Sequence, residues 1–299
     1  MRALLLAICL ASVACAAGGE YAGTAHSHHE TDDAGCPQAH TDAWTFHRLD
    51  PLSADDRAEM FSWGIVPGEY ISRDNVRVPY RLHVPPGWDA DRWYPLILHL
   101  HGAGGRGVDN GGQVMDAGGY TWIRPDFQAA YPSFVLYPQV PQSDQWVNVP
   151  FNAGSYSTSD VPESRYMRAT MEFVETVLLR TYRVNHRQMY ITGTSMGGYG
   201  VYDALVRYPT TFAAGLVIAG CGDYARAQRM RNIGVRAFHG SDDAVVPVQC
   251  ARDMDWTMSI QYGAPDWLYT EYAGAGHGVW FETLENQANW DWLMTRRRP

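Results

Sequence analysis

The chain has 299 residues, enough for one large domain or two small ones. Apolar residues make up 46% and charged residues 18%, which is typical of a folded globular protein and excludes a disordered one. The net charge of −9 argues against nucleic acid or an anionic membrane surface as an electrostatic partner.

The N-terminus is typical of an export signal. Arg2 precedes an apolar run that is too short to cross a bilayer as a helix. Residues 14–16 (Ala-Cys-Ala) fit a signal-peptidase site, whereas residues 12–15 (Ser-Val-Ala-Cys) resemble a bacterial lipoprotein box with Ser in place of the usual Leu. We expect a signal peptide over residues 1–15 and an exported protein, which is secreted, periplasmic or lipid-anchored at the cell envelope. The only expected membrane contact is a lipid on Cys15.

The segment 16–60 is expected to be a tether and an N-terminal extension. Residues 16–43 are rich in Gly, Ala, His and Asp and lack apolar periodicity, as flexible linkers do. Histidines in this segment could bind a metal loosely, but a solvated spacer is the simpler interpretation. A short helix is expected at Ala54–Phe61.

From Ile65 onward the pattern predicts a single domain, which we place at residues 61–299. Residues 70–72 and 76–84 are expected to form an antiparallel hairpin, and residues 95–100 and 133–137 to form buried strands. Further strands are expected near residues 190–193, 214–219, 235–238 and 268–272. Helices are expected at residues 163–182, 198–207, 248–262 and 281–294.

Strands that alternate with helices indicate an α/β fold. We expect about eight strands in a mostly parallel sheet, with the first two antiparallel and with helices on both faces. The connection between the sixth and seventh strands is short, so no lid domain is expected there.

The most specific motif in the chain is a nucleophile elbow. A short apolar run leads into Gly193-Thr194-Ser195-Met196-Gly197, and a helical pattern begins at once. This is the strand–turn–helix context in which a G-x-S-x-G turn exposes a serine hydroxyl. Glycine is required because a Cβ atom at either glycine position would crowd the turn. We predict that Ser195 is a catalytic nucleophile; the alternative is a strand-to-helix turn built of small residues.

A serine nucleophile needs a base and a group that orients the base. In α/β-hydrolases the serine is followed by Asp or Glu and then by His. His277 lies in a glycine-rich loop after the last strand and is predicted to be the base, whereas His239 is expected to support a turn. Three carboxylates, those of Asp223, Asp242 and Asp243, follow strands from which the base can be reached.

The negative charge that develops on the substrate oxygen needs backbone N–H donors. The residue after the nucleophile, Met196, supplies one, and the loop after the third strand supplies the other. That loop reads His101-Gly-Ala-Gly-Gly105, so Met196 and Ala103 are the predicted oxyanion hole. Together these features predict a serine hydrolase that needs neither a metal nor a cofactor.

Five cysteines stand at positions 9, 15, 36, 221 and 250. Cys9 leaves with the signal, and Cys15 either leaves or carries lipid. The other three remain in an oxidising compartment. A bridge between Cys221 and Cys250 is conceivable because both follow predicted strands, and two separate buried thiols are equally compatible with the sequence.

These motifs resemble the single-domain α/β-hydrolases of the predicted peptidase and carboxylesterase family, relatives of feruloyl and acetylxylan esterases and of dienelactone hydrolase. The resemblance runs from Pro95 to the C-terminus and is carried by the motifs at residues 100–110, 138–139, 146, 193–200, 207–209, 221–222, 239–247, 276–277 and 280. It implies that Asp243, in His-Gly-x-x-Asp, is the triad acid. The departures are Gly104-Gly105-Arg106, where Gly-Glu-Arg is commoner, and a shorter turn at Asp223.

The substrate is not specified by the resemblance. The one long loop, residues 139–162, is expected to be the wall of an open cleft, with Trp146 and Trp280 as candidate substrate contacts; core packing is the alternative for both. We expect an exported carboxylic ester hydrolase acting on an acylated polysaccharide or a polyester. Its alternatives are a serine peptidase of the prolyl-oligopeptidase type, a polyester depolymerase and a catalytically idle binding lipoprotein.

Overall fold

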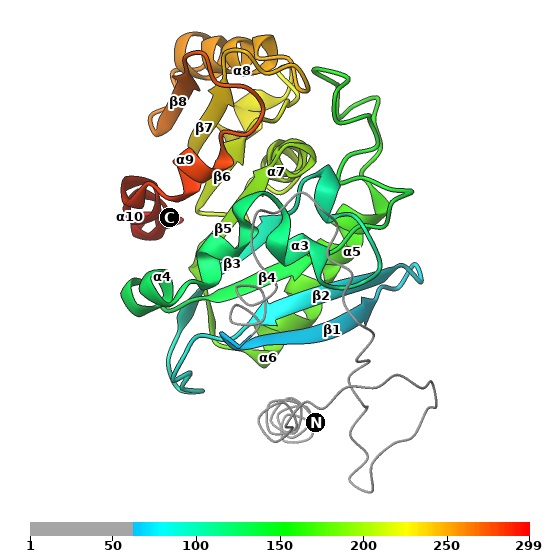
Figure 1. Ribbon diagram of the computed structural model, residues 1–299, viewed down its shortest axis with the longest axis vertical. Helices are drawn as coiled ribbons and strands as arrows, with labels where there is room; N and C mark the ends of the chain where they lie inside the picture. The colour runs from blue at the N-terminus through cyan, green and yellow to red at the C-terminus, as the bar shows by residue number, and fades with distance from the viewer. Residues whose placement is uncertain (1–61) are drawn as a thin grey trace, which may run out of the picture. The chain divides into compact units, whose positions relative to one another are not determined.

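The computed structural model describes residues 62–299 (Figure 1). The predictions for the signal peptide, Cys15, Cys36, the tether and the helix at Ala54–Phe61 lie outside the described residues. The domain boundaries therefore stay a prediction.

One eight-stranded sheet runs through the described residues, in the order β1-β2-β4-β3-β5-β6-β7-β8. The strands are β1 (Ile65–Ile71), β2 (Arg77–His83), β3 (Tyr94–Leu100), β4 (Phe134–Pro138), β5 (Val184–Thr194), β6 (Ala214–Ile218), β7 (Gly234–Gly240) and β8 (Trp267–Tyr272). β1 pairs antiparallel with β2, and β2 pairs antiparallel with β4, whereas every other pairing is parallel. The predicted fold class is confirmed.

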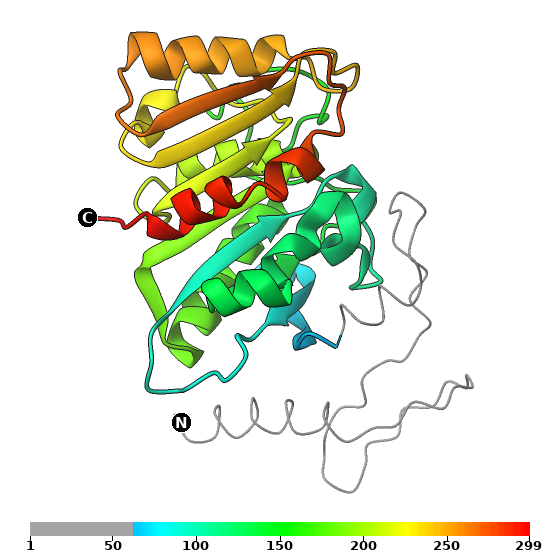
Figure 2. The same cartoon turned by 60° about the vertical axis from the view of Figure 1, so that its left-hand side comes forward.

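Helices cover both faces of the sheet (Figure 2). They are α3 (Gly112–Met115), α4 (Pro125–Ala130), α5 (Arg165–Phe173), α6 (Leu179–Thr181), α7 (Met196–Arg207), α8 (Gln249–Asp255), α9 (Trp280–Leu284) and α10 (Gln287–Thr295). α4 and α10 lie on one face, where Phe127 packs edge-on against Trp290 at 5.4 Å between ring centres. α5 and α7 lie on the other face.

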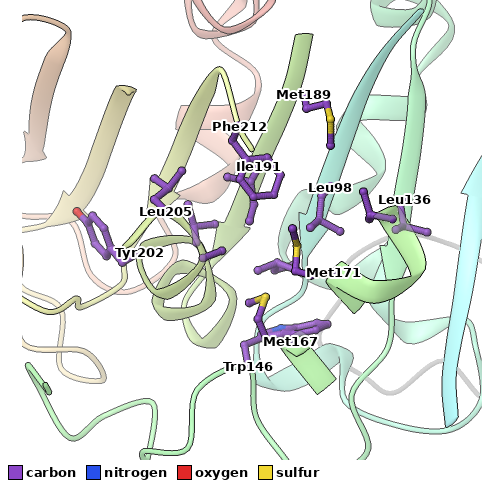
Figure 3. Packing of buried hydrophobic residues seen from close by; sticks show 14 of the residues in the cluster. Leu98, Leu136, Trp146, Met167, Met171, Met189, Ile191, Tyr202, Leu205 and Phe212 are labelled. Atoms are coloured by element: carbon purple, nitrogen blue, oxygen red, sulfur yellow. The ribbon is translucent and has the colours of Figure 1, made fainter. Parts of the chain in front are cut away.

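The larger part of the core lies between the sheet and the α5/α7 layer (Figure 3). Met167 and Met171 are one helical turn apart on α5 and are buried in the same cluster as Leu98 and Ile191 of the sheet, as the spacing of apolar residues predicts. Ser164 caps α5, because its hydroxyl accepts a hydrogen bond from the N–H of Met167 at 3.1 Å.

Two parts of the helical pattern differ from expectation. Residues 112–130 contain α3, a 3₁₀ segment and α4, none of which was predicted. The glycine-rich stretch has no helical periodicity, and its backbone is held by tertiary contacts such as the hydrogen bond from the Tyr137 hydroxyl to the Gly119 carbonyl, 2.9 Å. The last helix is divided into α9 and α10, because the Asn286 side chain accepts from the N–H of Ala288 and caps a new helix.

Candidate active site

Ser195 stands at a sharp turn between the end of β5 and the start of α7. Its backbone has φ 57° and ψ −118°, a conformation that residues other than glycine rarely adopt. The turn is this tight because Gly193 and Gly197 have no Cβ atom: one on Gly193 would press on the Gly197 carbonyl, and one on Gly197 on the Leu100 carbonyl. The arrangement is that of a nucleophile elbow.

Ser195, His277 and Asp243 form one chain of hydrogen bonds, although they lie on three separate loops. The Nε2 atom of His277 is 2.9 Å from Oγ of Ser195. Its Nδ1 atom is 2.7 Å from Oδ2 of Asp243, whose side chain is fully buried. An ionised carboxylate only accepts, so Nδ1 carries the proton and Nε2 is free to accept from the serine hydroxyl.

The Asp243 carboxylate is held in its ionised form. Burial opposes ionisation, but hydrogen bonds from His239, His277 and the N–H groups of Val246 and Val245 outweigh it and hold the pKa of Asp243 well below its usual range. The carboxylate therefore keeps its negative charge beside the imidazole throughout the neutral range.

The alternative acids have other partners. Asp223 accepts from the N–H and hydroxyl of Thr158 at 2.7 and 2.6 Å, and so anchors the long loop. Asp242 is exposed and accepts from the hydroxyl of Ser241. Among the three carboxylates, only Asp243 is hydrogen-bonded to His277 within the described part of the chain.

The two predicted oxyanion donors lie beside Ser195. Met196 is the first residue of α7, and Ala103 is the first residue of a short 3₁₀ turn, Ala103–Gly105. N–H groups in the first turn of a helix have no partner within that helix, so both can point at a ligand. Gly102 brings the second loop close, because a Cβ atom on Gly102 would lie 3.6 Å from that of Ser195.

His101 fixes the conformation of this loop. Its Nδ1 donates to the carbonyl of Gly102 at 2.6 Å, and its Nε2 accepts from the N–H of Val140 at 3.1 Å. Both ring nitrogens are used by the neutral imidazole, and burial lowers the pKa of His101 to about 4.

A family model described as "Putative esterase" matches residues 72–293, most of the chain. The chain belongs to this esterase family. Its family and its fold class agree with the resemblance seen in the sequence.

Solved structures similar to this chain include esterases. A thermostable esterase is 34% identical with a TM-score of 0.71, and the match covers 78% of this chain and 63% of that one. A ferulic acid esterase from Anaeromyces mucronatus is 14% identical with a TM-score of 0.55, covering 78% and 90%. Dipeptidyl peptidase 4 from Porphyromonas gingivalis is 13% identical with a TM-score of 0.56, covering 78% and 35%. The last two show a common fold alone. No curated protein sequence matches this one.

Trp146 is a core residue, the alternative that the sequence left open, and not a substrate contact, which corrects the prediction. Its side chain is fully buried, and its indole N–H donates to the carbonyl of His101 at 2.9 Å. It packs against Gly200 of α7, where a Cβ atom would clash with the indole. Trp146 therefore packs beneath the loop at residues 101–105, which contains Ala103, and supports it.

Trp280 is half-buried and packs edge-on against His277, with ring centres 5.6 Å apart. This position suits both a substrate contact and a support for the imidazole. Its role as a substrate contact stays a prediction.

The long loop at residues 139–162 packs against the rest of the domain. A disulfide joins Cys221, after β6, to Cys250 on α8 and packs against Val147 of this loop. The same buried cluster contains Val246, from the turn that holds Asp243. The disulfide, which the sequence left open, is therefore present, and it packs between the long loop and the turn at residues 243–246, here called the acid turn.

Arg106 is a residue whose part in the site was not predicted. Its guanidinium donates to the carbonyls of Ala103 at 3.1 Å and Gln142 at 3.3 Å and lies over the ring of Phe151. Gln142 donates back to the Arg106 carbonyl at 2.8 Å. Arg106 thus joins the loop at residues 101–105, here called the oxyanion loop, to the long loop. Its place in the family motif was the only signal in the sequence for this role.

Within residues 62–299, no helix is both long and apolar enough to cross a membrane. The same residues contain no group of three or more His, Cys, Asp and Glu side chains placed to hold a metal ion.

Proposed function

We propose that this esterase is an exported serine carboxylic ester hydrolase that acts through an acyl-enzyme on Ser195. The observation that carries the proposal is the hydrogen-bonded chain from Ser195 through His277 to Asp243, at a strained strand-to-helix turn. The fold and the family agree with this chemistry.

In the first half-reaction, Oγ of Ser195 attacks the ester carbonyl carbon while Nε2 of His277 takes the hydroxyl proton. The carbonyl oxygen becomes an oxyanion that accepts from the N–H groups of Met196 and Ala103. Each such donor lowers the barrier by roughly 3 kcal/mol. The carbon–oxygen bond to the alcohol then breaks, and His277 returns its proton to the departing alkoxide.

In the second half-reaction, water attacks the acyl group on Ser195 and gives its proton to His277. The second tetrahedral intermediate collapses, the acid leaves, and His277 reprotonates the serine. Asp243 accepts from Nδ1 throughout and stabilises the imidazolium formed in each half-reaction.

Esters of a bulky alcohol are the substrates that we expect, such as an acylated polysaccharide or a polyester. The connection from β6 to β7 contains only a 3₁₀ turn, Ala227–Met230, so no inserted domain covers the site from that side. Ferulic acid esterases are among the structural neighbours, which suits an aromatic or a short acyl group. The rival activity is peptide cleavage, since a dipeptidyl peptidase shares the fold.

Export is part of the proposal. It rests on residues 1–15, and the disulfide between Cys221 and Cys250 suits an oxidising compartment. If Cys15 carries lipid, expression in a bacterium places the protein in the membrane fraction and Cys15→Ser releases it. A mature N-terminus at Ala16 or later, found by mass spectrometry, would instead mean soluble export.

The activity is tested with an ester and an amide of the same acyl group, assayed side by side with Ser195→Ala as the blank. We expect kcat/KM for the ester to exceed that for the amide by at least about a hundredfold, roughly 2.7 kcal/mol in transition-state binding. Comparable rates would favour a peptidase. Hydrolysis that persists in pure Ser195→Ala would overturn the mechanism.

A further inference from the structure

His239 lies in the body of the sheet, one residue before the end of β7, and its side chain is 1% exposed. Its Nε2 is 3.0 Å from the Val246 carbonyl and 3.1 Å from Oδ2 of Asp243. That oxygen is the one that accepts from Nδ1 of His277 at 2.7 Å. Two imidazoles therefore contact one carboxylate oxygen.

The proton on His239 can be assigned from these partners. A backbone carbonyl and an ionised carboxylate are both acceptors, so Nε2 of His239 carries a hydrogen and shares it between them. The neutral ring is sufficient for this contact. His239 thus connects Asp243 to Val246, three residues further along the acid turn.

The remaining hydrogen bonds of Asp243 further restrict the movement of its carboxylate. Its Oδ1 accepts from the N–H groups of Val245 at 2.8 Å and Val246 at 2.9 Å. With donors on both oxygens, a rotation of the carboxylate would break several hydrogen bonds at once. The orientation of the Asp243 carboxylate toward His277 is therefore set by groups other than His277.

We propose that His239 is a positioning residue for the catalytic acid, which fixes the orientation of Asp243 and withdraws part of its negative charge from His277. The inference rests on the proposed triad. His239 touches neither the nucleophile nor the expected place of the substrate, so it acts only through Asp243.

Other polar groups near this cluster are accounted for. Glu271 on β8 is the register partner of His239 and is paired with Arg252 at 2.6 Å. Tyr199 on α7 is close enough to interact with the Asp243 charge. Asp242 is exposed and hydrogen-bonded to Ser241. Among residues 62–299, none of these three side chains is hydrogen-bonded to Asp243.

A purely structural role is the alternative, since the bond to the Val246 carbonyl would support the turn even without Asp243. The two roles separate in a double-mutant cycle of His239→Leu and Asp243→Asn, measured as kcat on a small aryl ester. Leu fills similar space without a donor. If His239 acts through Asp243, His239→Leu lowers kcat about 10- to 100-fold in the native background and less than about threefold in the Asp243→Asn background.

The pH dependence of kcat/KM gives a second readout. Without the His239 donor, more of the carboxylate charge faces His277 and stabilises its protonated form, so the acid limb of the profile moves up by about half a pH unit or more. His239→Gln places an amide N–H near the position of Nε2, and we expect it to restore kcat to within about threefold together with the native acid limb. His186→Gln, on an exposed histidine, is the matched control.

Equal losses in both backgrounds, or a His239→Leu variant with native kcat and a native pH profile, would overturn the inference. If His239→Leu does not fold, His239→Asn takes its place, since its amide is too short to reach Asp243. Ser195→Ala is assayed alongside. An active Ser195→Ala means that the proposed function has failed, whereas an inactive one with an additive cycle means that only the role of His239 has failed.

Discussion

A Cβ atom on Gly197 would overlap the carbonyl oxygen of Leu100, the last residue of β3. The elbow and the neighbouring strand end are thus in backbone contact, and the contact brings the oxyanion loop next to Ser195. We expect Gly197→Ala to lower the free energy of unfolding by about 3 kcal/mol or more, because neither backbone can move without disturbing the sheet. Chemical denaturation measures the loss. Gly276→Ala is the control, since nothing lies within 4 Å of its Cβ position; equal losses in the two variants would contradict this reading of the turn.

Asp243→Asn is expected to lower kcat by roughly 10⁴, as loss of the triad acid disturbs the tautomer of the histidine. Asp242→Asn should stay within about threefold of the native enzyme, because its exposed carboxylate is bonded to Ser241. Steady-state kinetics on one aryl ester compares the two. A larger loss in Asp242→Asn, or in Asp223→Asn, would mean that the acid is misassigned.

Substitutions of Trp146 and Trp280 should have different effects on stability and on substrate binding. Trp146→Phe removes the hydrogen bond to the His101 carbonyl and leaves a buried acceptor unpaired, so we expect a loss of about 1–3 kcal/mol in stability. Trp280→Ala is expected to change KM for a bulky ester while leaving the melting temperature nearly unchanged. A Trp146→Phe variant with native stability and a raised KM would restore Trp146 as a substrate contact.

The disulfide closes a loop with a sequence separation of 29 residues that contains both His239 and Asp243. The chain-entropy estimate for a loop of this length is about 3–4 kcal/mol. We expect a Cys221→Ala/Cys250→Ala variant to lose stability by that order, and reductant to destabilise the native protein but not the variant. Denaturation curves with and without reductant test this. Equal sensitivity of both proteins to reductant would argue against the bridge.

Buried histidines should make the fold sensitive to acid. Burial lowers the pKa of His99 to about 3, and lowers the pKa values of His83 and His101 to about 4. The unfolded chain takes up these protons near pH 6.5, whereas the folded chain does not, so stability is full above that pH and is lost as the pH falls toward 4. Between pH 6.5 and 5 the free energy of unfolding falls by an amount on the order of 2 kcal/mol for each of these histidines. Denaturant midpoints at pH 7.5, 6 and 5 measure it; a flat midpoint over that range would contradict the prediction, and His186→Gln should leave the trend unchanged.

Much of the fold could be predicted because the signals are local. Alternating strands and helices identified the mostly parallel sheet, and the spacing of Met167 and Met171 identified the buried face of α5. The stretch that contains α3 and α4 was missed, because its helices are short and are held by contacts with distant residues such as Tyr137.

The elbow, the chain order of the candidate triad and the loop expected to hold Ala103 could be identified from the sequence alone, because each depends on residue types within a few positions of a strand end. Which of these residues meet depends on the packing of the folded chain. Three carboxylates follow suitable strands, and the resemblance implied Asp243; the structure shows that Asp243 is the one hydrogen-bonded to His277, 34 residues away. Trp146 faces the core, and Cys221 reaches Cys250, because the long loop packs over α7 and the acid turn. Contacts between residues far apart in the chain depend on how whole elements pack, which no local pattern of side chains encodes.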